Sequence, residues 1–223
     1  MGRCVGKSSL ILKPDDQEYS LTQHFPDHLK TVALSMSGGV VSTLLLLLLI
    51  DFYGAENIRV FSGEYRSRRS WESVNSKATA ERLGIRQHHS ILQHNEFMSP
   101  QDNLQMFKTA KAIYRFDGWF NGTNAKMFDT RAVTSQTIVD KLNKVGYYVP
   151  FAFLKKEHTV DLYRHIGREE ELYRSFSCTL QPHIHCGKCP CCFERVRGFD
   201  RLGKKDQATY AREWEDIVKD CSH

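Results

Sequence analysis

The chain has 223 residues, of which 41% are hydrophobic and 26% are charged, and its formal net charge is +5. This balance is typical of a folded globular protein and excludes wholesale disorder and fibrous structure. The positive excess suits an anionic ligand such as a nucleotide, but it is too small to indicate nucleic acid binding. The longest apolar run, Leu44–Ile50, is far short of the roughly 20 residues that span a bilayer. We therefore expect a cytoplasmic protein that has no membrane association.

In chain order, residues 1–30 are polar and irregular, and we expect them to be a leader to the core. Apolar and small residues at 31–36 predict a buried strand, and the apolar run after it predicts a helix from about 42 to 53. Similar patterns predict further strands at 57–61, 85–91 and 118–122, and helices at 71–83, 103–114 and 156–166. Strands that alternate with helices of this length indicate an α/β fold, with a parallel sheet covered by helices on both faces.

The composition changes at the carboxy-terminal end, where cysteine, histidine and basic residues accumulate. We expect a nucleotide-binding domain over residues 31–170 and a small zinc-stapled subdomain over residues 171–223. A charged stretch at about 207–219 predicts a final helix.

The turn after the first strand, Ser37-Gly38-Gly39-Val40-Val41-Ser42-Thr43, has the composition of an anion-binding loop. Glycines let consecutive backbone N–H groups converge, and the following helix adds unpaired donors and the positive end of its dipole. The hydroxyls of Ser37, Ser42 and Thr43 would add side-chain donors. The alternative interpretation is an ordinary strand-to-helix turn in which Ser42 is the helix N-cap.

Four of the seven cysteines lie within residues 186–192. Cys178, Cys186, Cys189 and Cys192 are spaced by eight, three and three residues, and two overlapping C-x-x-C steps direct thiolates to one centre. We predict that these four bind a structural zinc ion, and that Cys191 is a bystander. The alternatives are a ligand from His183 or His185, buried free thiols, or a redox disulfide.

Together these motifs resemble the 7-cyano-7-deazaguanine synthase family of the PP-loop ATP pyrophosphatase superfamily. The family loop Ser-Gly-Gly-x-Asp-Ser stands here as residues 37–42. The family's Asp-Tyr-Gly-Gln-Arg-His run before a Glu is similar to residues 60–72, which end at Glu72. Its run from Pro-Leu through a Lys to Ser-Cys-Tyr is similar to Pro150-Phe151 with Lys155 or Lys156, the helix to Gly167, and Ser177-Cys178. Its zinc signature with the trailing Arg-x-x-Gly-Phe is similar to residues 186–199. The sequence departs from the family at Val41, where the loop Asp is missing, and at Ser62 and Gly63, where a second Asp is missing.

The resemblance implies that ATP, with Mg²⁺, activates 7-carboxy-7-deazaguanine as an adenylate, and that ammonia converts it to 7-cyano-7-deazaguanine. It implies catalytic roles for Ser37, Ser42, Arg66 and Lys155, with Lys156 as the alternative lysine and Arg68 and Arg69 as further phosphate contacts. The residues expected to bind the nucleotide are Leu34, Ser35, Met36, Ser37, Gly38, Gly39, Val40, Val41, Ser42, Thr43 and Phe61. The expected partners are small molecules and not nucleic acid, and a homodimer is left open.

Two other functions remain open at this stage. The chain is either a related PP-loop enzyme for another acid, a tRNA base or a sulfonucleotide, or a non-catalytic nucleotide- or zinc-binding protein that lost activity with the loop Asp. A zinc-ribbon DNA-binding function is weaker, because the basic residues are not concentrated on one helix.

Overall fold

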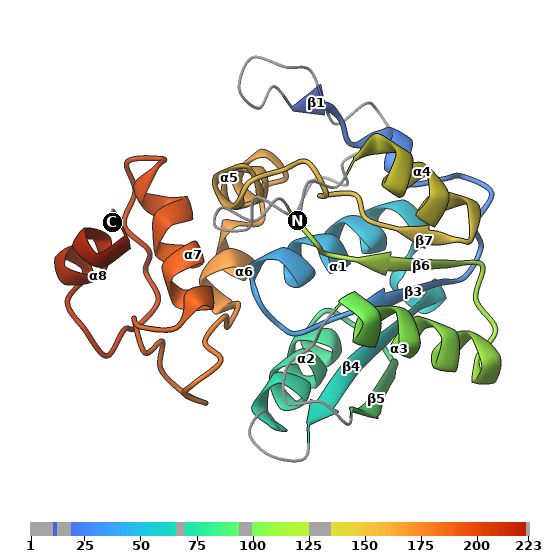
Figure 1. Cartoon of the computed structure of the whole chain (residues 1–223), viewed down its shortest axis with the longest axis horizontal. Helices are drawn as coiled ribbons and strands as arrows, with labels where there is room; N and C mark the ends of the chain where they lie inside the picture. Colours follow the sequence, from blue (N-terminus) through green and yellow to red (C-terminus); the bar gives the residue numbers. More distant parts are fainter. Residues whose placement is uncertain (1–10, 13–18, 66–69, 94–99, 125–134, 222–223) are drawn as a thin grey trace.

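The computed structural model describes residues 11–12, 19–65, 70–93, 100–124 and 135–221, and Figure 1 shows how they are arranged. Its centre is a five-stranded sheet in the order β5-β4-β3-β6-β7, in which every neighbouring pair is parallel. The strands are β3 (Val32–Ser35), β4 (Ile58–Tyr65), β5 (Gln87–Gln93), β6 (Gly118–Asn121) and β7 (Tyr147–Tyr148). The chain moves outward from β3 to β5 and then crosses back to β6, so the order reverses between β3 and β6.

Helices cover both faces of the sheet, because side chains along each strand alternate between two separate cores. Val32 and Leu34 of β3 face one core, and Ala33 between them faces the other. The first core contains α1 (Val40–Tyr53), α5 (Lys156–His165), α6 (Glu169–Arg174) and the end of α2 (Ser70–Arg82). The second contains α3 (Pro100–Ile113) and α4 (Gln136–Lys144). The predicted α/β class with helices on both faces is confirmed.

Residues before the sheet take part in its packing. The antiparallel pair of β1 (Ile11–Leu12) and β2 (Tyr19–Ser20) precedes a short 3₁₀ turn, η2 (Thr22–His24). Leu21, Phe25 and Leu29 are buried in the same core as α1. A second 3₁₀ turn, η3 (Ala55–Asn57), joins α1 to β4.

The carboxy-terminal part contains α7 (Pro190–Asp200) and α8 (Trp214–Cys221), which Figure 1 shows beside the end of the sheet from which α1 begins. The prediction of a helix over 207–219 is wrong in its first half. Asp206, just before this stretch, binds Arg195 of α7, and the backbone at 209–211 pairs with His185, so residues 207–213 are not helical. No described helix is long and apolar enough to cross a membrane.

Candidate active site and metal centre

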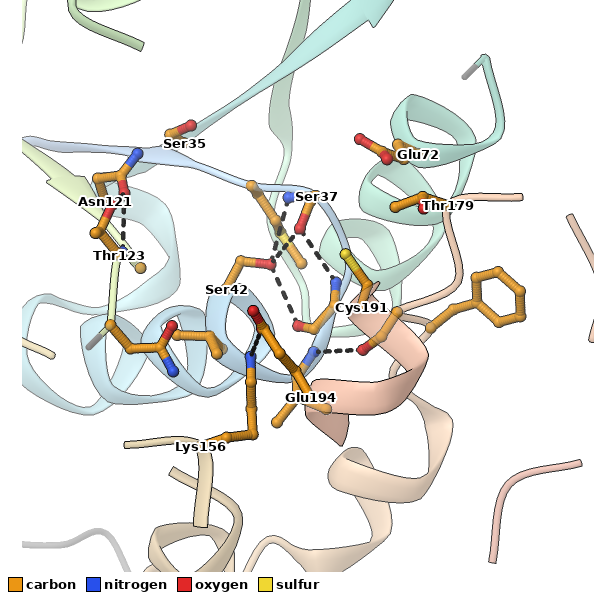
Figure 2. A pocket seen from close by; sticks show the side chains of 18 of the residues that line it. Ser35, Ser37, Ser42, Glu72, Asn121, Thr123, Lys156, Thr179, Cys191 and Glu194 are labelled. Atoms are coloured by element: carbon orange, nitrogen blue, oxygen red, sulfur yellow. Dashed lines mark hydrogen bonds and ion pairs between the residues drawn. The ribbon is translucent and has the colours of Figure 1, made fainter. Parts of the chain in front are cut away.

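A cavity of about 340 Å³ opens where the strand order reverses, at the carboxyl ends of β3 and β6. In open parallel sheets, such switch points are where ligands bind, because the two connecting loops diverge there and leave a crevice. The cavity's lining comes from the β3–α1 loop, the residues after β6, and the starts of α2, α5 and α7. Figure 2 shows the side chains that point into it.

The β3–α1 loop presents the amino-terminal end of α1 to this cavity. Gly39 is the N-cap of α1, so the alternative interpretation that made Ser42 the N-cap is wrong. No side chain caps the helix at Gly39, and the hydroxyls of Ser37 and Ser42 lie 3.3 Å apart beside it. Unpaired N–H groups and hydroxyls at a helix start favour an anionic group.

Glycine at position 38 is required by the backbone. Its φ of 79° is one that L side chains rarely adopt, and a Cβ there would lie 3.1 Å from the backbone of Asn75 and Ser76 on α2. The loop is held from the other side by the segment that follows α6. Phe176 donates its N–H to Gly38 O at 2.9 Å, and Ser177 Oγ accepts from the N–H of Val40 at 3.4 Å.

Val41, at the position of the family's Asp, lines the cavity although only 8% of its surface is exposed. It packs against the turn after β6: a Cβ on Gly122 would lie 3.2 Å from Val41 Cγ1. Beside it, Asn121 at the end of β6 pairs in register with Ser35 at the end of β3. Asn121 Oδ1 accepts hydrogen bonds from the backbone N–H and the hydroxyl of Thr123 at 2.9 and 2.5 Å.

Charged side chains enter the cavity from three helices, α2, α5 and α7. Lys156 at the start of α5 and Glu194 on α7 form an ion pair, with Nζ 3.3 Å from Oε2. Glu72 enters from α2, and Cys191 enters from the first turn of α7. Burial raises the pKa of the Cys191 thiol to about 12, so it is a neutral thiol in the cavity wall.

The four cysteines that the spacing singled out come together beside the cavity, and Cys178 also lines it. The Sγ atoms of Cys178, Cys186, Cys189 and Cys192 all lie within 4.8 Å of one another, and all four residues are buried. Backbone N–H groups point at the sulfurs at 3.3–3.4 Å, which stabilises thiolates. Such a set of buried sulfurs fits one metal ion.

A buried ion pair connects the helix that carries Cys192 to the segment that holds the β3–α1 loop. Arg195 is fully buried and donates to both carboxylate oxygens of Asp206, at 2.5 and 3.1 Å. It also donates to the carbonyls of Leu172 and Ser175, which lie just before the residues that hold the β3–α1 loop. Arg195 thereby connects α7 to the segment that fixes the start of α1.

The structure places the residues expected to act at the site differently, and Gly38 shapes the β3–α1 loop without lining the cavity. Those that line the cavity are Ser35, Met36, Ser37, Gly39, Val40, Val41 and Ser42, together with Lys156. Leu34, Thr43 and Phe61 are fully buried, and Phe61 packs against Trp119 and Tyr114 on the other face of the sheet. Lys155 is the N-cap of α5, so of the two lysines the structure brings Lys156 into the cavity lining. Arg66, Arg68 and Arg69 lie outside the described residues.

Sequence reasoning missed Glu194, Asn121 and Thr179 as cavity residues. Glu194 stands between Cys192 and Arg195 in the cysteine element, and helical spacing from Cys191 was the signal that would have placed it near the cavity.

Two family models match the chain in sequence. The model described as queuosine biosynthesis protein QueC matches residues 123–203, and the model described as asparagine synthase matches residues 27–121. A curated relative, 7-cyano-7-deazaguanine synthase of Chelativorans sp. (strain BNC1), is 34% identical over 91 residues. That match covers 40% of this chain and 38% of the relative.

Among solved structures the likeness is weak. The U34-tRNA thiolase NcsA of Methanococcus maripaludis with its [4Fe-4S] cluster has a TM-score of 0.47 at 15% identity, covering 90% of this chain and 85% of that one. The NMN synthetase of Francisella tularensis has a TM-score of 0.45 at 13% identity, covering 86% and 78%. Likeness at this level does not distinguish one activity from another, whereas the sequence matches confirm the resemblance to QueC, the 7-cyano-7-deazaguanine synthase family.

Proposed function

We propose that this protein uses ATP to convert 7-carboxy-7-deazaguanine and ammonia into 7-cyano-7-deazaguanine. The observation that carries the proposal is that two parts of the chain line one cavity. The first is the β3–α1 loop, within the stretch that resembles asparagine synthase. The second is α7 with Cys191 and Glu194, within the stretch that resembles QueC.

The reaction has two activation steps. The substrate carboxylate attacks the α-phosphorus of ATP, which forms an acyl adenylate and releases pyrophosphate. Ammonia then attacks the carbonyl carbon, loses a proton and displaces AMP, which leaves the amide. A second ATP activates the amide oxygen in the same way, and loss of AMP and two protons gives the nitrile.

The residues in the cavity are suited to hold a polyanion while charge builds on the leaving group. We assign the phosphates to the N–H groups at the start of α1 and to the hydroxyls of Ser37 and Ser42. We assign the neutralising cation to Lys156, whose ammonium faces the cavity. Asn121 and Thr123, at the end of β6, are placed to contact the acid.

We propose that the four cysteines hold Zn²⁺ in a structural role. Four sulfurs around one zinc at about 2.3 Å stand about 3.8 Å from one another, and Cys186 Sγ lies 3.9 Å from Cys192 Sγ. A closed four-sulfur site leaves no coordination position for substrate, so the ion would hold α7 in place beside the cavity.

Mg²⁺ would supply charge neutralisation to the triphosphate, and it takes oxygen ligands. The loop carboxylate of the family is absent at Val41, but Glu72 places a carboxylate in the same cavity from α2. We assign Glu72 as the protein ligand, with the remaining positions left to phosphate oxygens and water.

The proposal is tested by incubating the purified protein with ATP, Mg²⁺, an ammonium salt and 7-carboxy-7-deazaguanine, followed by mass spectrometry. We expect the amide and nitrile products and two AMP per nitrile. Parallel reactions contain other aromatic carboxylic acids or unmodified tRNA in place of the deazaguanine. AMP formation that depends on one of these, with none from 7-carboxy-7-deazaguanine, would contradict the substrate assignment.

Val41 favours a second candidate, a nucleotide-binding protein without turnover. A valine cannot hold a metal ion, whereas the backbone donors and hydroxyls of the loop remain. On this reading the protein binds ATP with the affinity of an active enzyme but releases no AMP with any acid.

A further inference from the structure

We propose that Glu194 is a positioning residue that fixes the ammonium of Lys156 in the cavity; this rests on the proposed function. The feature that leads to it is the contact between α7 and the first residue of α5. Figure 2 shows Lys156 and Glu194 joined directly, with both side chains in the cavity lining.

The stem of Lys156 is held by the backbone of α7. A Cβ on Gly198 would lie 2.8 Å from Lys156 Cγ, so glycine at 198 is what lets the two helices approach here. Glu194 is four residues before Gly198 and therefore on the same side of α7. One face of α7 thus accommodates the lysine's methylene groups and meets its ammonium.

Glu194 itself stands on a fixed part of the chain. It lies between Cys192 of the four-cysteine cluster and Arg195 of the buried ion pair. A further pair, Arg201 with Glu157 at 2.9 Å, joins the same two helices farther along. The carboxylate is therefore carried by a helix that is anchored on both sides of it.

A lysine side chain has four rotatable bonds and loses much conformational freedom when it is ordered. In this pair 18% of the lysine side chain and 25% of the glutamate side chain are exposed, so solvent screens their attraction only in part. Lys156 also lines the cavity, where its ammonium can meet an anionic ligand. Glu194 orders the cation before the phosphates arrive. If the carboxylate instead competed with the phosphates for the same ammonium, removing its charge would strengthen phosphate binding.

The test is a double-mutant cycle of Glu194→Gln and Lys156→Met, read by calorimetric binding of inorganic pyrophosphate and by kcat and KM for AMP release. We expect Glu194→Gln to weaken pyrophosphate binding in the wild-type background and to lower kcat more than it changes KM for ATP. In the Lys156→Met background the same change should do neither. Coupling between directly interacting side chains is about 2-fold to 140-fold in an equilibrium constant.

Glu215→Gln is the matched control, because it breaks a glutamate–lysine pair of similar length, 3.2 Å to Lys205, on α8 away from the cavity. Metal content and melting temperature are measured on every variant. Tighter pyrophosphate binding in Glu194→Gln would overturn the proposal in favour of competition. An equal effect in both backgrounds would also overturn it, because Glu194 would then not act through Lys156.

The two proposals fail in different ways. Pyrophosphate binding with the expected coupling but no reaction of 7-carboxy-7-deazaguanine leaves the role of Glu194 standing and removes the synthase activity. If the wild-type protein makes the nitrile but the two residues show no coupling, the synthase activity stands and the role of Glu194 is removed. A wild-type protein that binds neither pyrophosphate nor ATP overturns both.

Discussion

Replacing Arg195 with methionine tests how the carboxy-terminal part is held against the segment that fixes the β3–α1 loop. The buried guanidinium donates to Asp206, to the Ser175 carbonyl and hydroxyl and to the Leu172 carbonyl. Methionine fills part of that volume but donates nothing. The Asp206 carboxylate, 5% exposed, would lose its cation and keep the hydrogen bonds from the Tyr210 hydroxyl and the Ala208 N–H.

Removing one partner of a buried ion pair costs about 3–5 kcal/mol of stability. For a chain of this size, 1 kcal/mol corresponds to about 2–4 °C in melting temperature, so we expect Arg195→Met to melt about 6–20 °C lower. The measurement is scanning calorimetry of metal-loaded wild type, Arg195→Met, Asp206→Leu and the double variant. We expect the double variant to lose less stability than the two single losses added together, because it leaves no unpaired charge.

The pH dependence of stability gives an independent check. Burial alone would raise the pKa of Asp206, but the hydrogen bond and charge of Arg195 outweigh it and hold that pKa below 3.8. The pair's contribution is therefore complete above about pH 3.8 and is lost as the pH falls below it. In Arg195→Met only burial and two hydrogen bonds act on Asp206, so its pKa rises. Lowering the pH then no longer removes the stability that the ion pair contributes to the wild type. A loss of less than about 1 kcal/mol in Arg195→Met, or single losses that add fully, would refute the reasoning.

Three further predictions concern the metal centre and the loop. Cys189→Ser should lower the zinc content below half an equivalent by elemental analysis, whereas Cys191→Ser should leave it unchanged; equal loss in both would contradict the ligand set. Gly39→Val should abolish ATP binding in calorimetry but retain the fold, because a Cβ at position 39 makes only ordinary contacts, at 3.5 Å. Gly38→Val should also destabilise the fold. Unchanged ATP affinity in Gly39→Val would contradict the phosphate site. Val41→Asp should raise AMP release by about one to two decades, the worth of a charge-assisted contact of about 1.5–3 kcal/mol. A Val41→Asp protein that melts as the wild type does and binds ATP but gains no rate would show that the loop Asp is not what limits turnover.

The parallel sheet and its helices could be predicted because their signals are local. The apolar residues at 32–34 alternate between two cores, and the glycines after the first helices stand where the chain turns. The cysteine cluster could be predicted for the same reason, since spacings of three residues fix where neighbouring sulfurs point. The sheet with its helices and the cysteine cluster therefore depend little on residues far away in the sequence.

The rest of the site depends on contacts between distant segments, which spacing does not encode. Lys156 rather than Lys155 reaches the cavity because Gly198, 42 positions later, lets α7 pack against its stem. The sequence predicts Phe61 at the end of its strand, but β4 continues to Tyr65, so Phe61 lies in the middle of the strand. Its side chain faces the other core, since neighbouring strand residues point to opposite faces. The stretch after Asp206 is charged like a surface helix, yet its backbone pairs with His185 and cannot be helical.

The central claim, that this cavity activates a carboxylic acid with ATP, is tested most directly by following oxygen. 7-Carboxy-7-deazaguanine labelled with ¹⁸O in both carboxylate positions is supplied with ATP, Mg²⁺ and ammonia, and the AMP is examined by mass spectrometry. Because each activation passes one substrate oxygen to the α-phosphorus, the account predicts one ¹⁸O in each AMP and none in the nitrile. Unlabelled AMP, or label that appears only in inorganic phosphate, would contradict it.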